Sequence, residues 1–294
     1  MGKTWEIDFY SRPILDDQQK KVWELLVCES PQSTRQSADS LFRFAQNCPS
    51  DRVNAAWLSD ALRQAIELST EAPQGIRFFR RQMNNMILKA CKDVGIPATP
   101  SRRTIAVQHW LQQRELEVYS LDPTYQKQPA PSVQMMSDPP QPLPDAIMGN
   151  KWAFVNLAAS ELQDMPDWSI GFSEAFPLEL ASIAPDCQVP GLLIFSDRAI
   201  PIAAWISGLE LAMVRYSPAP QSQILLETGA SNSWTLANLD ISTQMVIANE
   251  AVSFERAKQK SNGVHFLAVQ SDPTAEDFAG FWLLQEAGAA SGYF

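Results

Sequence analysis

A proline-rich stretch in the middle of the chain constrains the fold more than any other feature of the sequence. Seven prolines fall within the 22 residues from Pro123 to Pro144, separated mainly by Ser, Gln and Met. Proline lacks a backbone N–H and fixes φ, so this stretch cannot continue a helix or a central strand. Its composition favours extended, polyproline-like segments over a flexible coil. We therefore expect a linker at 123–148 that spaces two domains, at 1–122 and 149–294.

Both halves combine strand-like alternation with helical periodicity. At 294 residues the chain exceeds the usual size of one domain, and a hydrophobic share of 45% lets each half bury a core. We expect a mixed α/β (α+β) fold in which each domain is a small mixed sheet with helices. In the first half we predict strands at 5–12, 22–28, 40–44 and 76–81 and helices at 54–69, 83–94 and 104–116. In the second half we predict strands at 152–157, 192–195, 210–216, 223–227, 234–238 and 264–270 and helices at 201–207, 243–260 and 275–286.

Positive charge is concentrated between Arg77 and Arg114, although the chain as a whole is acidic. Eight basic residues in this stretch face the single acid Asp93, a net charge of +7, whereas the whole chain carries −10. Residues 1–128 hold 17 basic and 15 acidic residues (+2), which leaves 6 and 18 (−12) for 129–294. Because a local positive field attracts phosphates, we interpret the stretch as a nucleic-acid contact surface. The alternative is a solvated face whose arginines pair with acids elsewhere in the fold.

Two arginines follow Pro100 and Ser101 at the expected start of a helix. Ser101 is a suitable N-cap, which would place Arg102 and Arg103 in the first helical turn. The helix dipole opposes cations there, but backbone N–H and guanidinium groups can converge on one anion. Such a pair is unfavourable for the helix and suitable for a phosphate. Acids of the preceding hairpin could instead neutralise it.

Aromatic side chains near the basic stretch could stack unpaired bases, which is how proteins hold single-stranded RNA. Taken one at a time, they could equally belong to the core. We therefore use charge and aromatic placement together to predict the RNA-binding residues, which are Arg77, Arg80, Arg81, Lys89, Arg102, Arg103, Trp110, Arg114 and Tyr119.

No motif supplies catalytic chemistry: the chain lacks a glycine-rich phosphate loop, a nucleophile elbow and a Cys–His pairing. The element order resembles the core of restriction-enzyme-like nucleases, and a similarity between 75–82 and 263–270 raises the hypothesis of an internal duplication of a degenerate core of that kind. Such nucleases need Glu-x-Lys on the third strand, where this chain has SLFRF and WTLAN. We expect no enzyme activity and no cofactor.

The sequence also predicts neither a metal site nor a membrane span. Glu6 and Asp8 lie two apart on a strand and could share a metal, but two solvated acids on a strand edge are the commoner explanation. With only two histidines there is no zinc pattern. No apolar run approaches the roughly 18 residues of a transmembrane helix. We expect reduced, mostly buried thiols at all four cysteines, which are Cys28, Cys48, Cys91 and Cys187.

A set of segments spread over nearly the whole chain is specific when taken together. The segments are WEIDFYSRP, WELLVC, IRFFRRQ, PSRRT, PGLLIFSDRAIPIAAW, LLETG, HFLAVQ and GFWLL. By these segments the chain resembles the Tab-type (Atab-type in land plants) RNA-binding translation factors of cyanobacteria and plastids. The resemblance implies a non-enzymatic protein that binds A/U-rich single-stranded sequence in the 5′ untranslated region of an mRNA. It also implies promotion of translation initiation and thereby of photosystem I accumulation.

The resemblance supplies no residue-level RNA contacts. A plastid member would carry a transit peptide, whereas this chain begins at its first motif. This predicts a cytoplasmic, cyanobacterial protein. The plant relatives are expected in the plastid stroma. Our leading hypothesis is thus an RNA-binding regulator with a protein partner for the acidic second half. A second hypothesis is a photosystem assembly factor or interaction scaffold that binds no RNA, and whose arginines only brace the fold. A nuclease comes third.

Overall fold

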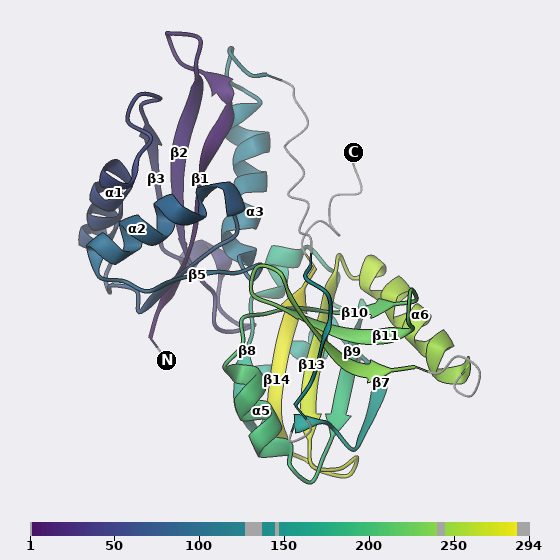
Figure 1. The fold of residues 1–294 in the computed structure, drawn as a ribbon. Helices are drawn as coiled ribbons and strands as arrows, with labels where there is room; N and C mark the ends of the chain where they lie inside the picture. Colours follow the sequence, from purple (N-terminus) through teal and green to yellow (C-terminus); the bar gives the residue numbers. More distant parts are fainter. Residues whose placement is uncertain (1, 127–136, 145–146, 240–244, 287–294) are drawn as a thin grey trace. The chain divides into compact units, whose positions relative to one another are not determined.

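The computed structural model describes residues 2–126, 137–144, 147–239 and 245–286, which form a mixed α/β protein of two compact units (Figure 1). The first unit contains residues 2–31 and 38–126, and the second contains 32–37 and the described residues from 137 onward. The first unit has β1 (Thr4–Leu15), β2 (Lys21–Glu29), β3 (Arg43–Cys48), α1 (Ala55–Leu68), β4 (Gly75–Phe78), α2 (Asn84–Val94), β5 (Ala98–Pro100) and α3 (Ile105–Arg114).

The second unit begins with short elements and ends with its longest helix and two central strands. They are β6 (Gln141–Pro142), β7 (Lys151–Ala158), α4 (Ala159–Leu162), β8 (Ile170–Glu174), β9 (Gln188–Phe195), α5 (Ala199–Ser207), β10 (Leu211–Ser217), β11 (Gln223–Thr228), β12 (Asn232–Asn238), α6 (Met245–Lys260), β13 (Val264–Gln270) and β14 (Phe278–Gln285).

The expected linker lies partly outside the described residues, at 127–136 and 145–146, as do positions 243–244 of the expected long helix. Within the linker range, β6 pairs in parallel with β12. The domain boundaries stay a prediction.

The first unit is a sheet in the order β3-β2-β1-β4-β5 with helices on both faces. The expected hairpin is β1–β2, an antiparallel pair that aligns Phe9 with Leu25, and β4 pairs in parallel with β1. Trp5, Ile7 and Phe9 alternate along β1 and are buried against α1 and α2. On the opposite face lies α3, which contacts β1 and β2 (Figure 1). The intervening residues of β1 and β2 therefore face α3.

Two strands of the first unit differ from the sequence expectation. The third strand begins at Arg43 instead of residue 40, because Ala38–Ser40 forms a 3-10 helix. The strand expected at 76–81 ends at Phe78, which is aligned with Pro100 at the end of the short β5. Pro100 has no N–H to extend that ladder. The chain then turns through a 3-10 helix into α2, so the arginines after Phe78 do not alternate between two faces of a sheet.

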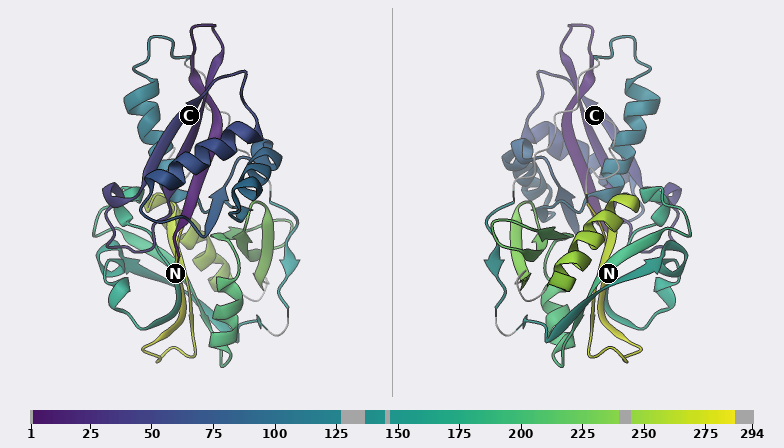
Figure 2. Two further views of the ribbon diagram at one scale, coloured as in Figure 1. Left: turned by 90° about the vertical axis from the view of Figure 1, so that its left-hand side faces the viewer. Right: turned by 90° about the vertical axis from the view of Figure 1, so that its right-hand side faces the viewer.

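The second unit packs two sheets around one core. Their strand orders are β7-β9-β13-β14-β8 and β10-β11-β12-β6. Leu192, Leu226, Leu267 and Trp282 are among the residues that fill the core between the sheets. Helix α5 contacts β14 and β8, whereas α6 lies across β7, β9 and β10 (Figure 2). The three strands expected between 210 and 238 are present as β10, β11 and β12.

The helix expected at 275–286 is wrong, because that segment is the strand β14. It pairs antiparallel with β13 and in parallel with β8. Its centre is buried on both faces, so the sequence is apolar without strand alternation and looks like a helix. A Cβ on Gly280 would lie 2.2 Å from the indole of Trp282, which explains a glycine in this strand.

Buried side chains complete the hydrogen bonds of β10, which lies at the edge of its sheet. The Val214 N–H donates to His265 Nε2, and Lys258 Nζ donates to the Val214 carbonyl, both at 2.8 Å. The Tyr216 N–H donates to Glu255 at 2.6 Å. Burial and then the charge of Lys258 hold the pKa of His265 well below its usual value, so the imidazole is neutral and can accept. These side chains fix β10 to α6 and β13.

Candidate nucleic-acid interface

The face of the first sheet under α3 carries charged residues that are buried. Glu6 and Asp8 on β1 and Glu24 on β2 occupy the positions between the core residues of their strands. All three are buried, with Asp8 at 0% exposure. The explanation of Glu6 and Asp8 as solvated edge acids is therefore wrong, because α3 and the segment after it cover this face. Buried carboxylates need partners, and arginines supply them.

Asp8 is held between two guanidinium groups. Arg80 Nε donates to Asp8 Oδ1 at 2.7 Å, and Arg12 Nη1 donates to Asp8 Oδ2 at 2.7 Å. Burial opposes the ionisation of Asp8, but the charges of Arg12 and Arg80 outweigh it, so the pKa of Asp8 lies below its usual value. The Arg80 guanidinium also stacks 4.4 Å from the ring centre of Tyr10. Arg80 is thus part of the interior of the first unit.

Glu24 is the second centre of this buried network. It accepts a hydrogen bond from Arg12 Nε at 2.9 Å and further bonds from Arg114 Nη2 and the Tyr119 hydroxyl. Arg114 Nε also donates to the Tyr119 oxygen at 3.1 Å. Burial raises the pKa of Tyr119 above its usual value, so the hydroxyl stays protonated and donates. Tyr119 lies on the π-helix Glu115–Tyr119 that continues α3 and is 1% exposed.

Glu6 connects β1 to the start of α3. Its carboxylate accepts from the Val107 N–H at 2.9 Å and from the Ser30 hydroxyl at 2.8 Å. Val107 is in the first turn of α3, where N–H groups have no partner within the helix. Burial raises the pKa of Glu6 to about 7, while these two hydrogen bonds and the charges of Arg77 and Arg103 oppose the rise. Glu6 therefore acts as a capping group for α3 from a neighbouring strand.

Ser101 is not the N-cap of the helix, and Arg102 and Arg103 are not in its first turn. The helix begins at Ile105, and the Ser101 oxygen accepts from the Arg103 N–H at 3.0 Å in a turn before it. Arg102 and Arg103 are 5% and 6% exposed. The expected opposition between these arginines and the helix dipole therefore does not apply. The charge of Arg103 instead lowers the pKa of Glu6, which lies on the hairpin. This agrees with the alternative that acids of the hairpin neutralise the arginine pair.

The exposed positive charge of the stretch lies around the start and outer face of α2. Arg81 opens the 3-10 helix before α2, and Lys89 and Lys92 lie on α2; all three are exposed. Lys89 pairs with Asp93 at 2.9 Å, an exposed i,i+4 contact of the kind that contributes little to stability. Lys92 has no ion-pair partner within the described part of the chain. These three side chains reach solvent.

Trp110, on α3, lies between the buried network and the solvent. It is half-buried, and the guanidinium groups of Arg43 and Arg114 lie 5.6 and 5.7 Å from its ring centre. Its ring is thus engaged with cations of the protein. Arg77 on β4 is half-buried, is aligned with Glu6 on β1, and acts on that carboxylate electrostatically.

The predicted residues therefore fall into groups. Arg80, Arg114 and Tyr119 meet in the network around Asp8 and Glu24. Arg77 and Arg103 act on Glu6, Arg102 is buried, and Trp110 borders the network. Arg81 and Lys89 are exposed on a different part of the unit.

Sequence reasoning missed the acids and Arg12, which organise the first two groups. Glu24 stands inside the apolar run WELLVC, which is the one signal that could have indicated a buried acid. Glu6 and Asp8 alternate with Trp5, Ile7 and Phe9, which is also the pattern of a strand with one solvated face and so gives no such signal.

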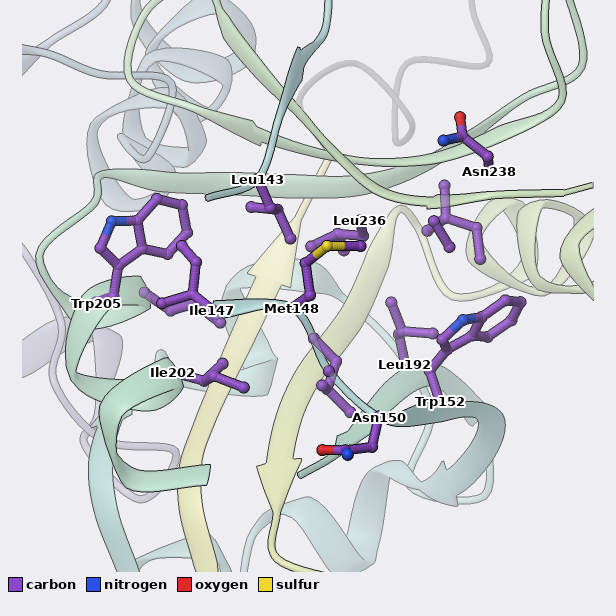
Figure 3. A pocket seen from close by; sticks show the side chains of 15 residues that line it. Leu143, Ile147, Met148, Asn150, Trp152, Leu192, Ile202, Trp205, Leu236 and Asn238 are labelled. Carbon is purple, nitrogen blue, oxygen red and sulfur yellow. The ribbon is translucent and has the colours of Figure 1, made fainter. Parts of the chain in front are cut away.

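The second unit contains an apolar cavity of about 330 Å³ (Figure 3). Trp152 and Trp205 lie on opposite sides of it, and Met148 reaches toward it from the end of the linker range. Asn150 and Asn238 are its labelled polar residues. With few polar groups and no charged one, this cavity suits an apolar group and not a phosphate.

A metal-binding cluster and a membrane-spanning helix are both absent from the residues that the structure describes. No cluster of three or more His, Cys, Asp or Glu side chains there could hold a metal ion. In the same ranges, no helix has the length and apolar character needed to cross a bilayer.

Comparison with known proteins links both halves to one family. Residues 4–114 match the family model described as RNA-binding protein Tab2/Atab2 N terminal, and residues 130–285 match that of the RNA-binding protein Tab2/Atab2, C-terminal domain. The Protein TAB2 homolog, chloroplastic, of Arabidopsis thaliana is 37% identical over 289 residues, which cover 96% of this chain and 74% of that protein. The protein of the same name from Zea mays is 36% identical over 291 residues, 96% of this chain and 71% of that protein. No solved structure matches the chain significantly.

Proposed function

Because the chain belongs to the Tab2/Atab2 family of RNA-binding proteins, we propose that it binds an A/U-rich single-stranded leader sequence of an mRNA and promotes its translation for photosystem I biogenesis. The family's description supports RNA binding in general. In this proposal the protein acts in a cyanobacterial cytoplasm or a plastid stroma. The relatives named above are called chloroplastic, which agrees with a role in photosynthesis.

The single observation that carries the assignment of RNA to the first unit is its charge. Residues 1–128 carry a net charge of +2 and include the exposed cations Arg81, Lys89 and Lys92, whereas residues 129–294 carry −12. RNA backbones bind to such a field and release counterions, which gives salt-dependent affinity. Among the predicted contacts, exposure favours Arg81 and Lys89, which reach solvent. Arg80, Arg114 and Tyr119 support the surface from inside, because their polar groups bind Asp8 and Glu24.

The test is a titration of the full chain against labelled RNAs of one length: an A/U-rich single strand, a G/C-rich single strand and an A/U-rich duplex. We expect the A/U-rich strand to bind most tightly, with a log–log salt slope of about −0.7 for each phosphate neutralised. Equal affinity for all three would remove the leader specificity and leave general RNA binding. No binding at low salt would overturn the proposed function.

A second candidate function is protein binding by the second unit, as in an assembly factor. The apolar cavity beside Trp152 and Trp205 favours it, because apolar pockets with few polar groups accept side chains or small apolar ligands. It requires no RNA. A chain that enriches photosystem proteins but no RNA from cells would favour this alternative.

A further inference from the structure

The second unit, despite its negative charge, has a surface hollow whose lining includes two cations. The hollow has a volume of about 570 Å³ and lies where α6 passes over the paired ends of β7 and β9. From α6 it receives Ser253, Arg256 and Lys260, and from the sheet Asn156 and Gln188. All five side chains are exposed. No carboxylate lines the hollow.

The cations of this hollow differ from Lys258 and Arg215 of the same unit, which form ion pairs. Arg256 and Lys260 lie one helical turn apart, and neither has an ion-pair partner in the described ranges of the chain. Lys258, between them in sequence, is buried and bound to Glu255 at 3.1 Å and Glu286 at 2.8 Å. Arg215 pairs with Glu227 at 2.8 Å. Of the six basic residues in 129–294, two therefore meet in one hollow without a counter-charge.

A structural explanation covers only part of this arrangement. Lys260 is in the last turn of α6, where the helix dipole and free carbonyl groups favour a cation. Arg256 lies a turn earlier, where the dipole effect has faded. The dipole also gives no reason for two amides and a hydroxyl to line the same hollow.

The lining matches the chemistry of a phosphate. A guanidinium and an ammonium group supply charge, and the amide N–H₂ groups of Asn156 and Gln188 supply further donors toward phosphate oxygens, whereas the Ser253 hydroxyl donates to the Asn249 carbonyl at 2.9 Å. Arginine is the preferred residue for such oxygens because its donors form a planar fork. A carboxylate ligand would satisfy fewer of these donors.

We propose that this hollow holds a backbone phosphate of the bound RNA, so that the second unit contributes a contact of its own. The inference rests on the proposed function, since the phosphate belongs to the same RNA. It also separates the two units by chemistry: the first unit offers a broad positive surface, and the second offers a defined hollow within an otherwise repelling surface.

The first experiment compares two doubly substituted full-length chains. Arg256→Gln/Lys260→Gln removes both cations of the hollow. Lys151→Gln/Arg198→Gln removes two exposed cations of the same unit outside it and changes the net charge equally. Each lost phosphate contact should lower the magnitude of the log–log salt slope by about 0.7. If variant and unsubstituted chain bind equally at 1 M salt, the variant should therefore bind about five-fold more weakly at 0.1 M salt. We expect this for the first variant and less than a two-fold change in affinity for the second.

The outcomes separate this inference from the proposed function. If the unsubstituted chain binds RNA and both variants bind it equally well, or lose affinity equally, the hollow is not a contact while the function stands. If the unsubstituted chain binds no RNA, both are overturned. Circular dichroism and melting confirm that both variants are folded.

The second experiment uses Cys187, the cysteine that lines the hollow. Cys28, Cys48 and Cys91 are buried, whereas Cys187 is half-exposed, so alkylation followed by mass spectrometry reports on it selectively. Burial, with a smaller effect of Asp186, raises the pKa of its thiol, so labelling is run at about pH 9. RNA should slow the alkylation of Cys187 in the unsubstituted chain and not in Arg256→Gln/Lys260→Gln. Protection by millimolar inorganic phosphate but not by RNA would assign the hollow to free phosphate and overturn the RNA contact.

Discussion

Neighbouring arginines with the same charge should respond in opposite ways to substitution. Arg80→Ala removes hydrogen bonds to Asp8 at 2.7 and 3.4 Å inside the first unit. Breaking a buried ion pair costs about 3–5 kcal/mol, and charge-assisted hydrogen bonds contribute about 1.5–3 kcal/mol each. Because Arg12 still pairs with Asp8 at 2.7 Å, we expect the lower end, a loss of about 3 kcal/mol in the free energy of unfolding.

Arg81→Ala removes an exposed side chain instead. We expect its effect on stability to stay within about 0.5 kcal/mol, the usual range for surface positions. For a unit of this size a loss of 3 kcal/mol lowers the melting temperature by roughly 12 °C. The RNA salt slope should change by about 0.7 for Arg81→Ala and not for Arg80→Ala, measured at a temperature where both are folded.

Asp8→Asn is the matched control for Arg80→Ala. It breaks the same buried pair but makes the chain more positive, so a loss of stability without loss of RNA affinity is expected again. The assays are thermal and urea unfolding followed by circular dichroism, and RNA titration by fluorescence anisotropy. An Arg80→Ala protein that melts within 2 °C of the unsubstituted chain but loses RNA affinity would refute the structural role of Arg80.

Three further changes test the buried groups. The pKa of Glu6 is raised from 4.5 to about 7, so its contribution to stability is fully present below pH 4.5 and is lost as the pH rises through 7. The free energy of unfolding, measured in urea, should therefore fall by about 3 kcal/mol between these pH values. Glu6→Gln should flatten this fall. The pKa of His265 is depressed, so its contribution to stability is present above about pH 6.5 and is lost as the pH falls below that value. His265→Gln should reduce this loss of stability in acid, measured in the unfolding transition of the second unit. Tyr119→Phe deletes the hydroxyl that donates to Glu24 and should lower stability by about 1–3 kcal/mol in thermal unfolding while RNA affinity is kept, whereas a drop in affinity alone would place Tyr119 in the interface.

The sequence allowed the fold class and most elements to be predicted, because local patterns determine them. The hairpin of β1 and β2, helix α1 and the three strands β10 to β12 follow from alternation, helical period and turn residues. Strand β14 could not be predicted in this way, since burial on both faces removes the alternation that marks a strand.

The partners of the arginines could not be predicted because they come from distant parts of the chain. Asp8 and Arg80 are separated by 72 residues, and Glu24 and Arg114 by 90. Charge counting detects a basic stretch but not the acids that the sheet brings beneath it. Arg80 and Arg81 have the same local sequence surroundings and differ only through the end of β4, which tertiary pairing sets.

Cross-linking of the full chain to an A/U-rich single strand, followed by mass spectrometry of the peptides, shows directly which unit contacts RNA. We expect cross-linked peptides from the first unit that include Arg81 and the exposed face of α2. Cross-links to α6 would accompany them and would agree with the phosphate hollow. Cross-links confined to the second unit, with none between residues 77 and 114, would contradict RNA binding by the first unit.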